Sequence, residues 1–263
     1  MSLIITEKLM QGYNELTNID SKEPGMLMDI GIQKIAAGER NTFHSLEKES
    51  AYLLLDGEVE FKWSGNRKLG KRNSVFDEMA TVLHVPCGTE VCIDALTDSE
   101  ILIQKTLNHN KFEPHFYEPM NLGEEVFSDK VWGNTANRLV RRIFDYFNAP
   151  YSNMVMGETI NLPGKWSSYI PHSHDQPEVY YYRFNGEHGF GAGFIEDTAY
   201  KIQNNSALCI PGGCIHPQTS APGYAMYFCW MIRHLVDNPW TTRNDDERYL
   251  WLLKQDVKIW PEK

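Results

Sequence analysis

Short apolar segments separated by turn-forming residues are the feature that most limits how this 263-residue chain can fold. Glycine, proline and other turn residues recur at intervals of roughly 8–12 residues, and short apolar runs lie between them. Examples of such runs are 50–55, 59–63, 81–85, 100–104, 179–184 and 207–210. Because these runs have the length of strands and are too short for helices, the pattern predicts an all-β sandwich or barrel.

The densest group of metal-binding side chains begins at His172. His174 follows two residues later, and Glu178 follows four residues after that. In an extended chain, residues two apart point to the same face, so all three can share one face if the segment is a strand. The spacing predicts that His172, His174 and Glu178 hold one ion.

A second segment is predicted to add His216 to this set. It reads Pro211-Gly-Gly-Cys-Ile-His216, and it follows Asn205, a residue type that tolerates the positive φ of a turn. A strand–turn–strand arrangement returns His216 toward the first two histidines. Cys214 has the parity of His216, so it is an alternative ligand from this segment.

Three imidazoles and one carboxylate predict a single divalent transition-metal ion. Zinc fits best, and manganese, iron or nickel are alternatives, whereas calcium and magnesium prefer oxygen ligands. Three or four protein ligands leave coordination positions for substrate or water, which is typical of a catalytic site.

These two segments resemble the paired motifs of the cupin superfamily. The superfamily's first motif has His-x-His, then Glu, then Gly, and its second has Pro-x-Gly followed by His; here Gly186 and Pro211 to His216 match these positions. The chain departs from these motifs in two places: seven residues separate Gly164 from His172, and Asn205 replaces the glycine of the second motif. The resemblance implies a cupin fold with a metal held by His172, His174, Glu178 and His216.

Neighbouring residues resemble a narrower family, the 5-deoxyglucuronate isomerases of bacterial inositol breakdown and the related 4-deoxy-hexosulose-uronate ketol-isomerases. The matching residues are Glu158, Gly164, Trp166-Ser-Ser-Tyr, Pro171-His-x-His-Asp, Glu178-x-Tyr-Tyr, Gly189-Phe190, His216-Pro217 and Pro222-Gly-Tyr-x-x-Tyr. The chain departs from that family in the strand Gly191-Ala-Gly-Phe-Ile-Glu and at Trp230. The resemblance implies a metal-dependent aldose–ketose isomerase that acts on a sugar acid.

A repeat at a fixed offset predicts two jelly-roll-like β-barrels in tandem, a bicupin. Glu49 to Gly57 has the spacing of Glu178 to Gly186, and Pro86-Cys-Gly matches Pro211-Gly-Gly. The positions that correspond to the three histidines are Phe43, Ser45 and Val91, so only Glu49 remains in the first half. We expect a degenerate barrel without a metal site at 1–125 and a metal-binding barrel at 126–263.

Isomerisation of a sugar also requires groups that move protons and bind the substrate. Glu158, on the strand before the metal motif, is the first candidate for the base, and Tyr182 is a second catalytic candidate. Tyr180 and Arg183 are candidates for substrate binding, although parity puts Arg183 on the face opposite Glu178. The alternative for Glu158 is a structural or surface carboxylate, and the alternative for the two tyrosines is aromatic packing inside the barrel.

Two other functions remain open from the sequence. An Fe(II) cupin dioxygenase would use the same four ligands, and a non-catalytic sugar-binding cupin would bind without turnover. The net charge of −10 argues against a nucleic-acid partner, and there is no apolar run long enough to span a membrane. Five cysteines without a Cys-x-x-Cys pair predict reduced thiols and a cytoplasmic location. A homo-oligomer is an open possibility.

Two more segments bear on the site. Residues 137–147 have a pattern that does not separate helix from strand, and Arg138, Arg141 and Arg142 in it either bind an acidic substrate or are solvated and paired charges. Residues 245–255 predict a short amphipathic C-terminal helix with Asp245 near its cap and Trp251 in the core.

Overall fold

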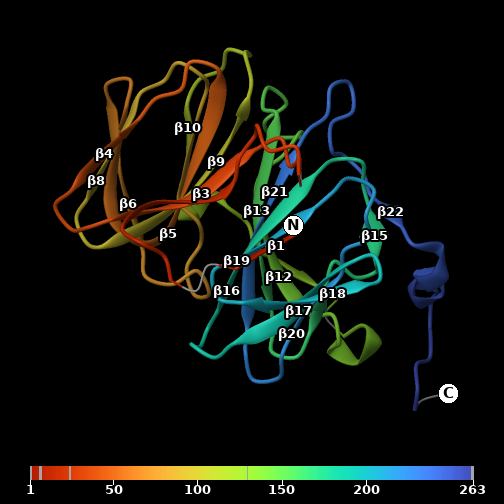
Figure 1. The fold of residues 1–263 in the computed structure, drawn as a ribbon. Helices are drawn as coiled ribbons and strands as arrows, with labels where there is room; N and C mark the ends of the chain where they lie inside the picture. Colours follow the sequence, from red (N-terminus) through yellow and green to blue (C-terminus); the bar gives the residue numbers. More distant parts are fainter. Residues whose placement is uncertain (1, 6–7, 24, 129, 262–263) are drawn as a thin grey trace.

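The computed structural model describes residues 2–5, 8–23, 25–128 and 130–261. Nearly all regular structure is strand, as the sequence predicts, and the strands form two halves that lie side by side (Figure 1). No described helix is long and apolar enough to cross a membrane.

The first half is one nine-stranded sheet system with the path β10-β7-β5-β9-β3-β2, to which β4, β6 and β8 are attached. Its strands are β2 (Gly12–Thr17), β3 (Asp29–Ile35), β4 (Arg40–Phe43), β5 (Lys48–Trp63), β6 (Asn66–Arg72), β7 (Val82–Val85), β8 (Val91–Ala95), β9 (Ser99–Leu107) and β10 (His115–Tyr117). The 16-residue β5 pairs with β7 and β9 in its first part and with β6 and β8 in its second. It therefore joins the two faces of this half.

The second half contains a seven-stranded sheet in the order β1-β19-β16-β21-β13-β12-β11 and a four-stranded sheet in the order β14-β20-β17-β18. The strands of the larger sheet are β1 (Leu3–Ile5), β11 (Glu125–Phe127), β12 (Arg138–Phe144), β13 (Met154–Asn161), β16 (Glu178–Phe184), β19 (Ser206–Ile210) and β21 (Met226–Arg233). Those of the smaller sheet are β14 (Trp166–Ser167), β17 (Phe190–Ile195), β18 (Thr198–Gln203) and β20 (Gln218–Ser220). A separate pair joins β15 (His172–Ser173) to β22 (Asn244–Asp245).

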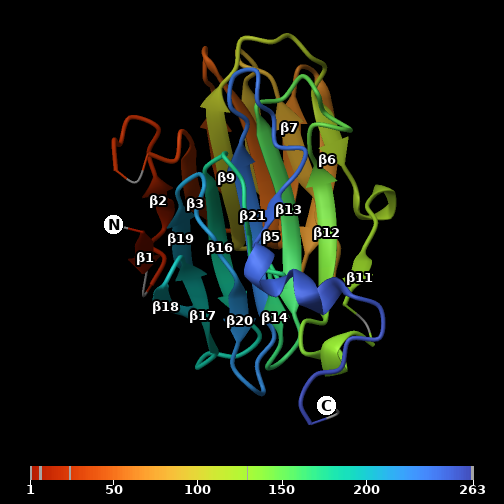
Figure 2. The same cartoon turned by 90° about the vertical axis from the view of Figure 1, so that its right-hand side faces the viewer.

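The architecture is that of a bicupin, but the sheets do not close into continuous barrels. Strand β1 also crosses between the halves, because Leu3–Ile5 pairs with β19 (Figure 2). A boundary at 125/126 would cut β11, so strand membership puts the division between Tyr117 and Glu125. The segment 137–147 contains strand β12.

The described residues contain three helices, all short 3-10 turns: η1 (Pro119–Asn121), η2 (Trp132–Asn134) and η3 (Glu247–Leu253). The predicted C-terminal helix is η3, and the cap is Asp246, whose side chain accepts a hydrogen bond from the Arg248 amide, rather than Asp245. Trp251 is exposed, so the prediction that it lies in the core was wrong. Asp245 instead pairs with His172 through the backbone of β22 and β15.

Strand parity divides the apolar side chains into three clusters. On β16, Tyr180 and Tyr182 face the interior of the second half, whereas Val179 and Tyr181 face the first half. On β5, Tyr52 faces the interior of the first half. Both of these strands are therefore covered on both faces, which explains their nearly continuous apolar runs.

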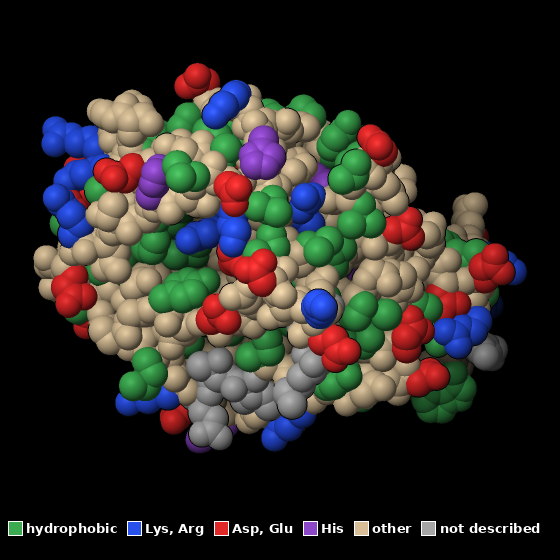
Figure 3. Space-filling model, turned by 45° about the horizontal axis from the view of Figure 1, so that its top comes forward, with side chains coloured by type: hydrophobic (Ala, Val, Ile, Leu, Met, Phe, Trp, Pro, Cys, Tyr) green, Lys and Arg blue, Asp and Glu red, His purple; other side chains and the backbone are tan. Residues whose placement is uncertain are grey.

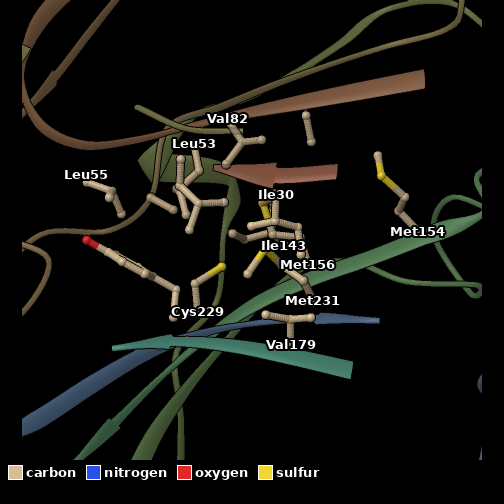
Figure 4. Packing of buried hydrophobic residues seen from close by; sticks show 14 of the residues in the cluster. Ile30, Leu53, Leu55, Val82, Ile143, Met154, Met156, Val179, Cys229 and Met231 are labelled. Carbon is tan, nitrogen blue, oxygen red and sulfur yellow. The ribbon is translucent and has the colours of Figure 1, made fainter. Parts of the chain in front are cut away.

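The largest cluster lies between the two halves and unites them (Figure 4). It contains residues of the first half such as Ile30, Leu53 and Val82, and residues of the second half such as Met156 and Met231. Because one cluster contains residues of both halves, the halves share a core. Each such side chain contributes roughly 1.5–3 kcal/mol when fully buried.

Charged side chains of both signs are interspersed over the face drawn in Figure 3. The net charge of −10 is therefore not gathered there into a single acidic field. Among the described cysteines none forms a disulfide, and three of the five are buried.

Candidate metal centre

His174, Glu178 and His216 converge at one end of the second half, and their ligand atoms all lie within 4.8 Å of one another. Glu178 Oε2 is 3.2 Å from His174 Nε2 and 3.3 Å from His216 Nε2. Two ligands of one ion at about 2.1 Å would be separated by roughly this distance. This is the only such group of three that the described residues contain, and Cys214 is not part of it.

His172 lies beside this group but outside that limit. Its ring centroid is 4.9 Å from that of His216, and both His172 and His174 line the same pocket. Only His172 and Ser173 of the predicted extended segment form a strand, β15, which pairs with β22. The chain bends at 175–176 before Glu178 begins β16.

The turn at 211–213 brings His216 to the first histidines. The Gly213 amide donates to the carbonyl oxygen of His174 at 2.7 Å. A Cβ on Gly212 would lie 1.9 Å from the Asp175 carbonyl oxygen, so only glycine allows this approach. Asn205, which opens this stretch, has φ +62°, the turn conformation that the sequence predicts.

All three histidines are oriented as metal ligands are. The Nδ1–H groups of His172, His174 and His216 donate to the carbonyl oxygens of Ile170, Gln176 and Cys214, at 2.9, 3.0 and 2.8 Å. With Nδ1 protonated, each ring offers the Nε2 lone pair, which is how backbone carbonyls fix ligand histidines. His216 Nε2 is buried and faces Glu178 Oε2 at 3.3 Å without forming a well-aligned hydrogen bond to any described residue. The cluster therefore fits a metal ion.

Electrostatics keep these groups in their ligating forms. Burial lowers the pKa of His172 to about 3, so this imidazole is neutral. Burial alone would raise the pKa of Glu178, but its close contacts with His174 and His216 outweigh this effect and hold the pKa at about 2.

A pocket of about 140 Å³ opens onto the cluster. Its walls come from strands β11, β12, β13, β16 and β21, from the segment that contains β14 and β15, and from the loop before β22. The lining residues are Phe127, Arg138, Val140, Arg142, Thr159, Ser167, Ser168, His172, His174, Glu178, Tyr180, Phe228, Trp230, Trp240 and Arg243. Trp230 lies against the strand at Gly157, where a Cβ would come within 2.1 Å of the indole.

Of the other predicted site residues, Tyr180 lines this pocket, and its hydroxyl lies 3.2 Å from that of Ser168. Burial, followed by the negative charge of Glu178, raises the pKa of Tyr180 well above its usual value, so the phenol is protonated. Tyr182 does not line the pocket. Its hydroxyl donates to Gln218 Oε1 at 2.6 Å, and Gln218 Nε2 donates to the His216 carbonyl oxygen at 2.8 Å. Tyr182 thus helps to position the backbone at His216 through Gln218.

The structure does not bring Glu158 to the pocket. Glu158 is paired across the sheet with Cys229, which faces the core between the halves, whereas its neighbour Gly157 faces Trp230. Its oxygens accept hydrogen bonds from Arg72 Nη1 and Nη2, at 2.7 and 2.9 Å, and from the Tyr227 hydroxyl at 2.7 Å. A carboxylate with these partners has a structural task, so its assignment as the base is corrected.

Arg183 is on the face opposite Glu178, as parity predicts. Its Nη2 donates to Glu100 of the first half, and its Nε donates to the Tyr181 hydroxyl at 2.8 Å. Arg183 therefore connects the halves, and the structure does not place it at the pocket.

Glu49, the expected remnant of a ligand set, is also buried between the halves. It accepts hydrogen bonds from the Ser152 hydroxyl and the Asn153 amide and contacts His84 Nε2 at 3.0 Å. On β5, Glu49 faces away from the interior side that Tyr52 occupies, whereas Glu178 and Tyr180 of β16 line the same pocket, so Glu49 is not on the face that corresponds to Glu178. The interior of the first half is instead filled with apolar side chains.

Sequence reasoning did not find Trp240 or Arg243. Both precede β22, and they reach the pocket only because β22 pairs with β15. No periodicity or motif around them indicates this.

Facing sheets in two halves, with a histidine–glutamate cluster at one end of the second, define a cupin. A model of the KduI/IolB family matches residues 3–252, and the chain belongs to that family. A 5-deoxy-glucuronate isomerase of Geobacillus thermodenitrificans is 24% identical over 246 residues, covering 86% of each chain. The enzyme of that name from Bacillus subtilis strain 168 is 22% identical over 253 residues, covering 87% of this chain and 88% of its own. With homologues of this kind across most of its length, the chain is an enzyme of the isomerase class.

Solved structures agree on the fold. An IolB-like protein of Salmonella typhimurium LT2 superimposes with a TM-score of 0.87 at 21% identity, covering 97% of this chain and all of that one. A variant of Bacillus subtilis oxalate decarboxylase gives a TM-score of 0.66 at 11% identity, covering 94% of this chain and 78% of its own.

Proposed function

We propose that this chain is a metal-dependent aldose–ketose isomerase that acts on a sugar acid, 5-deoxy-glucuronate or a close relative of it. The observation that carries the proposal is the orientation of the histidines. The Nδ1 atom of each one forms a hydrogen bond to a backbone carbonyl oxygen, and the Nε2 atoms of His174 and His216 lie beside Glu178. The names of the curated relatives support the reaction class and the substrate.

The proposed ligands are His174, Glu178 and His216, with His172 as the fourth. Zinc is our first choice of ion, and manganese, iron or nickel are alternatives. When bound, a divalent ion supplies a Lewis acid that polarises the sugar carbonyl and makes the neighbouring C–H more acidic.

The other pocket residues bind the sugar and handle protons. Phe228, Trp230 and Trp240 provide apolar surfaces that hold the sugar and exclude water. Tyr180 is our proposed proton donor, because its phenol is protonated, faces the pocket and lies beside the Ser168 hydroxyl. Tyr182, through Gln218, fixes the backbone at His216.

The test combines metal analysis with NMR. The purified protein is analysed for bound metal, and 5-deoxy-glucuronate and a panel of uronates are followed in D₂O. We expect about one bound ion per chain, aldose–ketose conversion and deuterium incorporation at the carbon next to the carbonyl.

The variant His174→Ala should lose both the ion and the conversion, whereas the exposed His188, replaced by alanine, is a matched control that should keep both. Bound metal without exchange on any uronate would refute the isomerase proposal, and oxygen consumption with iron would favour a dioxygenase instead. Binding of a sugar without exchange would favour a sugar-binding protein. A protein that binds no ion would refute the metal centre.

A further inference from the structure

Three arginines line the pocket beside the candidate metal centre: Arg138, Arg142 and Arg243. Among the described lining residues, Glu178 is the only carboxylate, and it faces the histidines. The walls are therefore rich in positive charge, although the chain as a whole carries a net charge of −10.

Arg142 and Arg243 each have an acidic partner. Arg142 Nη1 lies 3.1 Å from Asp145 Oδ2, and Arg243 Nε lies 2.9 Å from Asp245 Oδ1. Both arginine side chains are more than 40% exposed. Water and their partners already compensate their charges.

Arg138 differs from both. Only 6% of it is exposed, and no carboxylate in the described part of the chain lies within ion-pair distance. Its Nη1 donates to the Ala136 carbonyl oxygen at 3.0 Å and to the Ser128 hydroxyl at 3.4 Å, and its Nη2 donates to the Tyr169 carbonyl oxygen at 3.5 Å. The guanidinium also lies over the Phe127 ring, 5.2 Å from its centroid.

Burial, and then the charge of Arg243, lower the pKa of Arg138 to about 10, so the group is still charged at neutral pH. A buried cation with no carboxylate beside it among the described residues is costly, and an anion that enters the pocket relieves that cost. A guanidinium matches a carboxylate through two parallel hydrogen bonds, and apolar walls such as Phe127 strengthen the attraction by lowering the local dielectric constant.

We propose that Arg138, with Arg243 beside it, binds the carboxylate of the sugar-acid substrate and so selects sugar acids over neutral sugars. This rests on the proposed function, because it names the group by which the isomerase recognises its substrate. The ion at His174, Glu178 and His216 would then lie at the carbonyl end of the sugar, and Arg138 at the acid end.

The experiment compares 5-deoxy-glucuronate with 5-deoxyglucose, which carries a hydroxymethyl group in place of the carboxylate. Turnover and calorimetric binding of both sugars are measured for the wild-type holoenzyme, Arg138→Gln, Arg138→Lys and Arg243→Gln. Arg40→Gln is the matched control, since Arg40 pairs with Asp94 on the surface of the first half. Thermal unfolding checks that each variant is folded.

We expect the wild type and Arg40→Gln to prefer the acid by ~100-fold or more in kcat/KM, since a site built for a charged group rejects the analogue that lacks it. Arg138→Gln should lower kcat/KM for the acid by ~100-fold, mainly through KM, and leave 5-deoxyglucose within about threefold. Arg138→Lys should fall between, and Arg243→Gln should reduce the preference by about threefold to tenfold.

Equal losses for both sugars, or an unchanged preference in Arg138→Gln, would overturn the proposal. If Arg138→Gln does not fold, an unchanged preference in Arg243→Gln overturns it, and a reduced one supports it. If the wild type converts neither sugar, the isomerase proposal fails separately. Calorimetry then decides on Arg138, because tighter binding of the acid that disappears in Arg138→Gln still supports the carboxylate site, and equal binding of both sugars refutes it.

Discussion

Replacing Glu158 by glutamine distinguishes a structural carboxylate from a catalytic base. Glu158 and Arg72 are both fully buried in the core between the halves, and two hydrogen bonds join them. Burial lowers the pKa of Arg72, but the charge and hydrogen bonds of Glu158 outweigh this and raise it. We expect Glu158→Gln to destabilise the fold and to leave the chemistry of the folded protein intact.

The expected magnitude follows from the contacts. Removing one partner of a buried ion pair costs about 3–5 kcal/mol, because it leaves an uncompensated charge. Glutamine can still accept one hydrogen bond from Arg72 or Tyr227 but has lost one acceptor oxygen, which adds about 1 kcal/mol or more. A loss of about 4–6 kcal/mol would lower the melting temperature by roughly 10–20 °C in a protein of this size.

The assay is urea unfolding of Glu158→Gln, Arg72→Met and the double variant, together with kcat per folded protein. A double-mutant cycle should give a coupling energy of about 2–3 kcal/mol, since the double variant leaves neither Arg72 nor Glu158 as a charge without its partner. Stability within about 1 kcal/mol of wild type, or a fall in kcat above ~100-fold in folded Glu158→Gln, would show that our placement of this residue is mistaken.

Three further predictions concern single side chains. Tyr180→Phe removes the proposed proton donor and should lower kcat by ~100-fold with little change in bound metal. An unchanged kcat, or a loss of the bound metal, would contradict this role. Burial, followed by the charge of Arg233, lowers the pKa of His234 to about 4, and its Nδ1 accepts a hydrogen bond from the Trp240 amide. The unfolded chain therefore takes up a proton that the folded chain does not, so stability should fall as the pH drops from about 6.5 to about 4. His234→Asn, which keeps an acceptor, should lose less stability over that range in melting experiments, and parallel curves would disprove the assignment. Asn205→Ala should cost about 1 kcal/mol because Asn205 has φ +62°, and Asn205→Gly should cost less; equal unfolding free energies would count against backbone strain as the cause.

Local sequence patterns were sufficient for the strands and for most of the metal cluster. The runs at 50–55, 179–184 and 207–210 lie in β5, β16 and β19. His174 and Glu178 are four residues apart across a bend at 175–176, and the glycine turn before His216 folds back on them. Strand parity and turn chemistry are local properties, so they can be predicted from a single chain.

Parity also showed that Tyr180 and Arg183 face opposite sides, but it did not show what lies on each side. Glu158 has a partner 86 residues away in the first half, and Glu49 has partners 103 and 104 residues away in the second. Nothing near either residue in the sequence indicates these contacts. A carboxylate on a strand therefore looks the same whether it faces a pocket or an ion pair.

The sequence by itself thus determined the strand content, the cupin motifs and the candidate ligands, because each depends on residues that are close along the chain. Only the tertiary structure decided that the two halves share a core, that Glu158 pairs with Arg72, and that Trp240 and Arg243 reach the metal pocket. The physical reason is that burial and charge pairing depend on which strand faces meet. That meeting is set by the packing of both halves together, with β1 and β22 joined to strands far away in the chain.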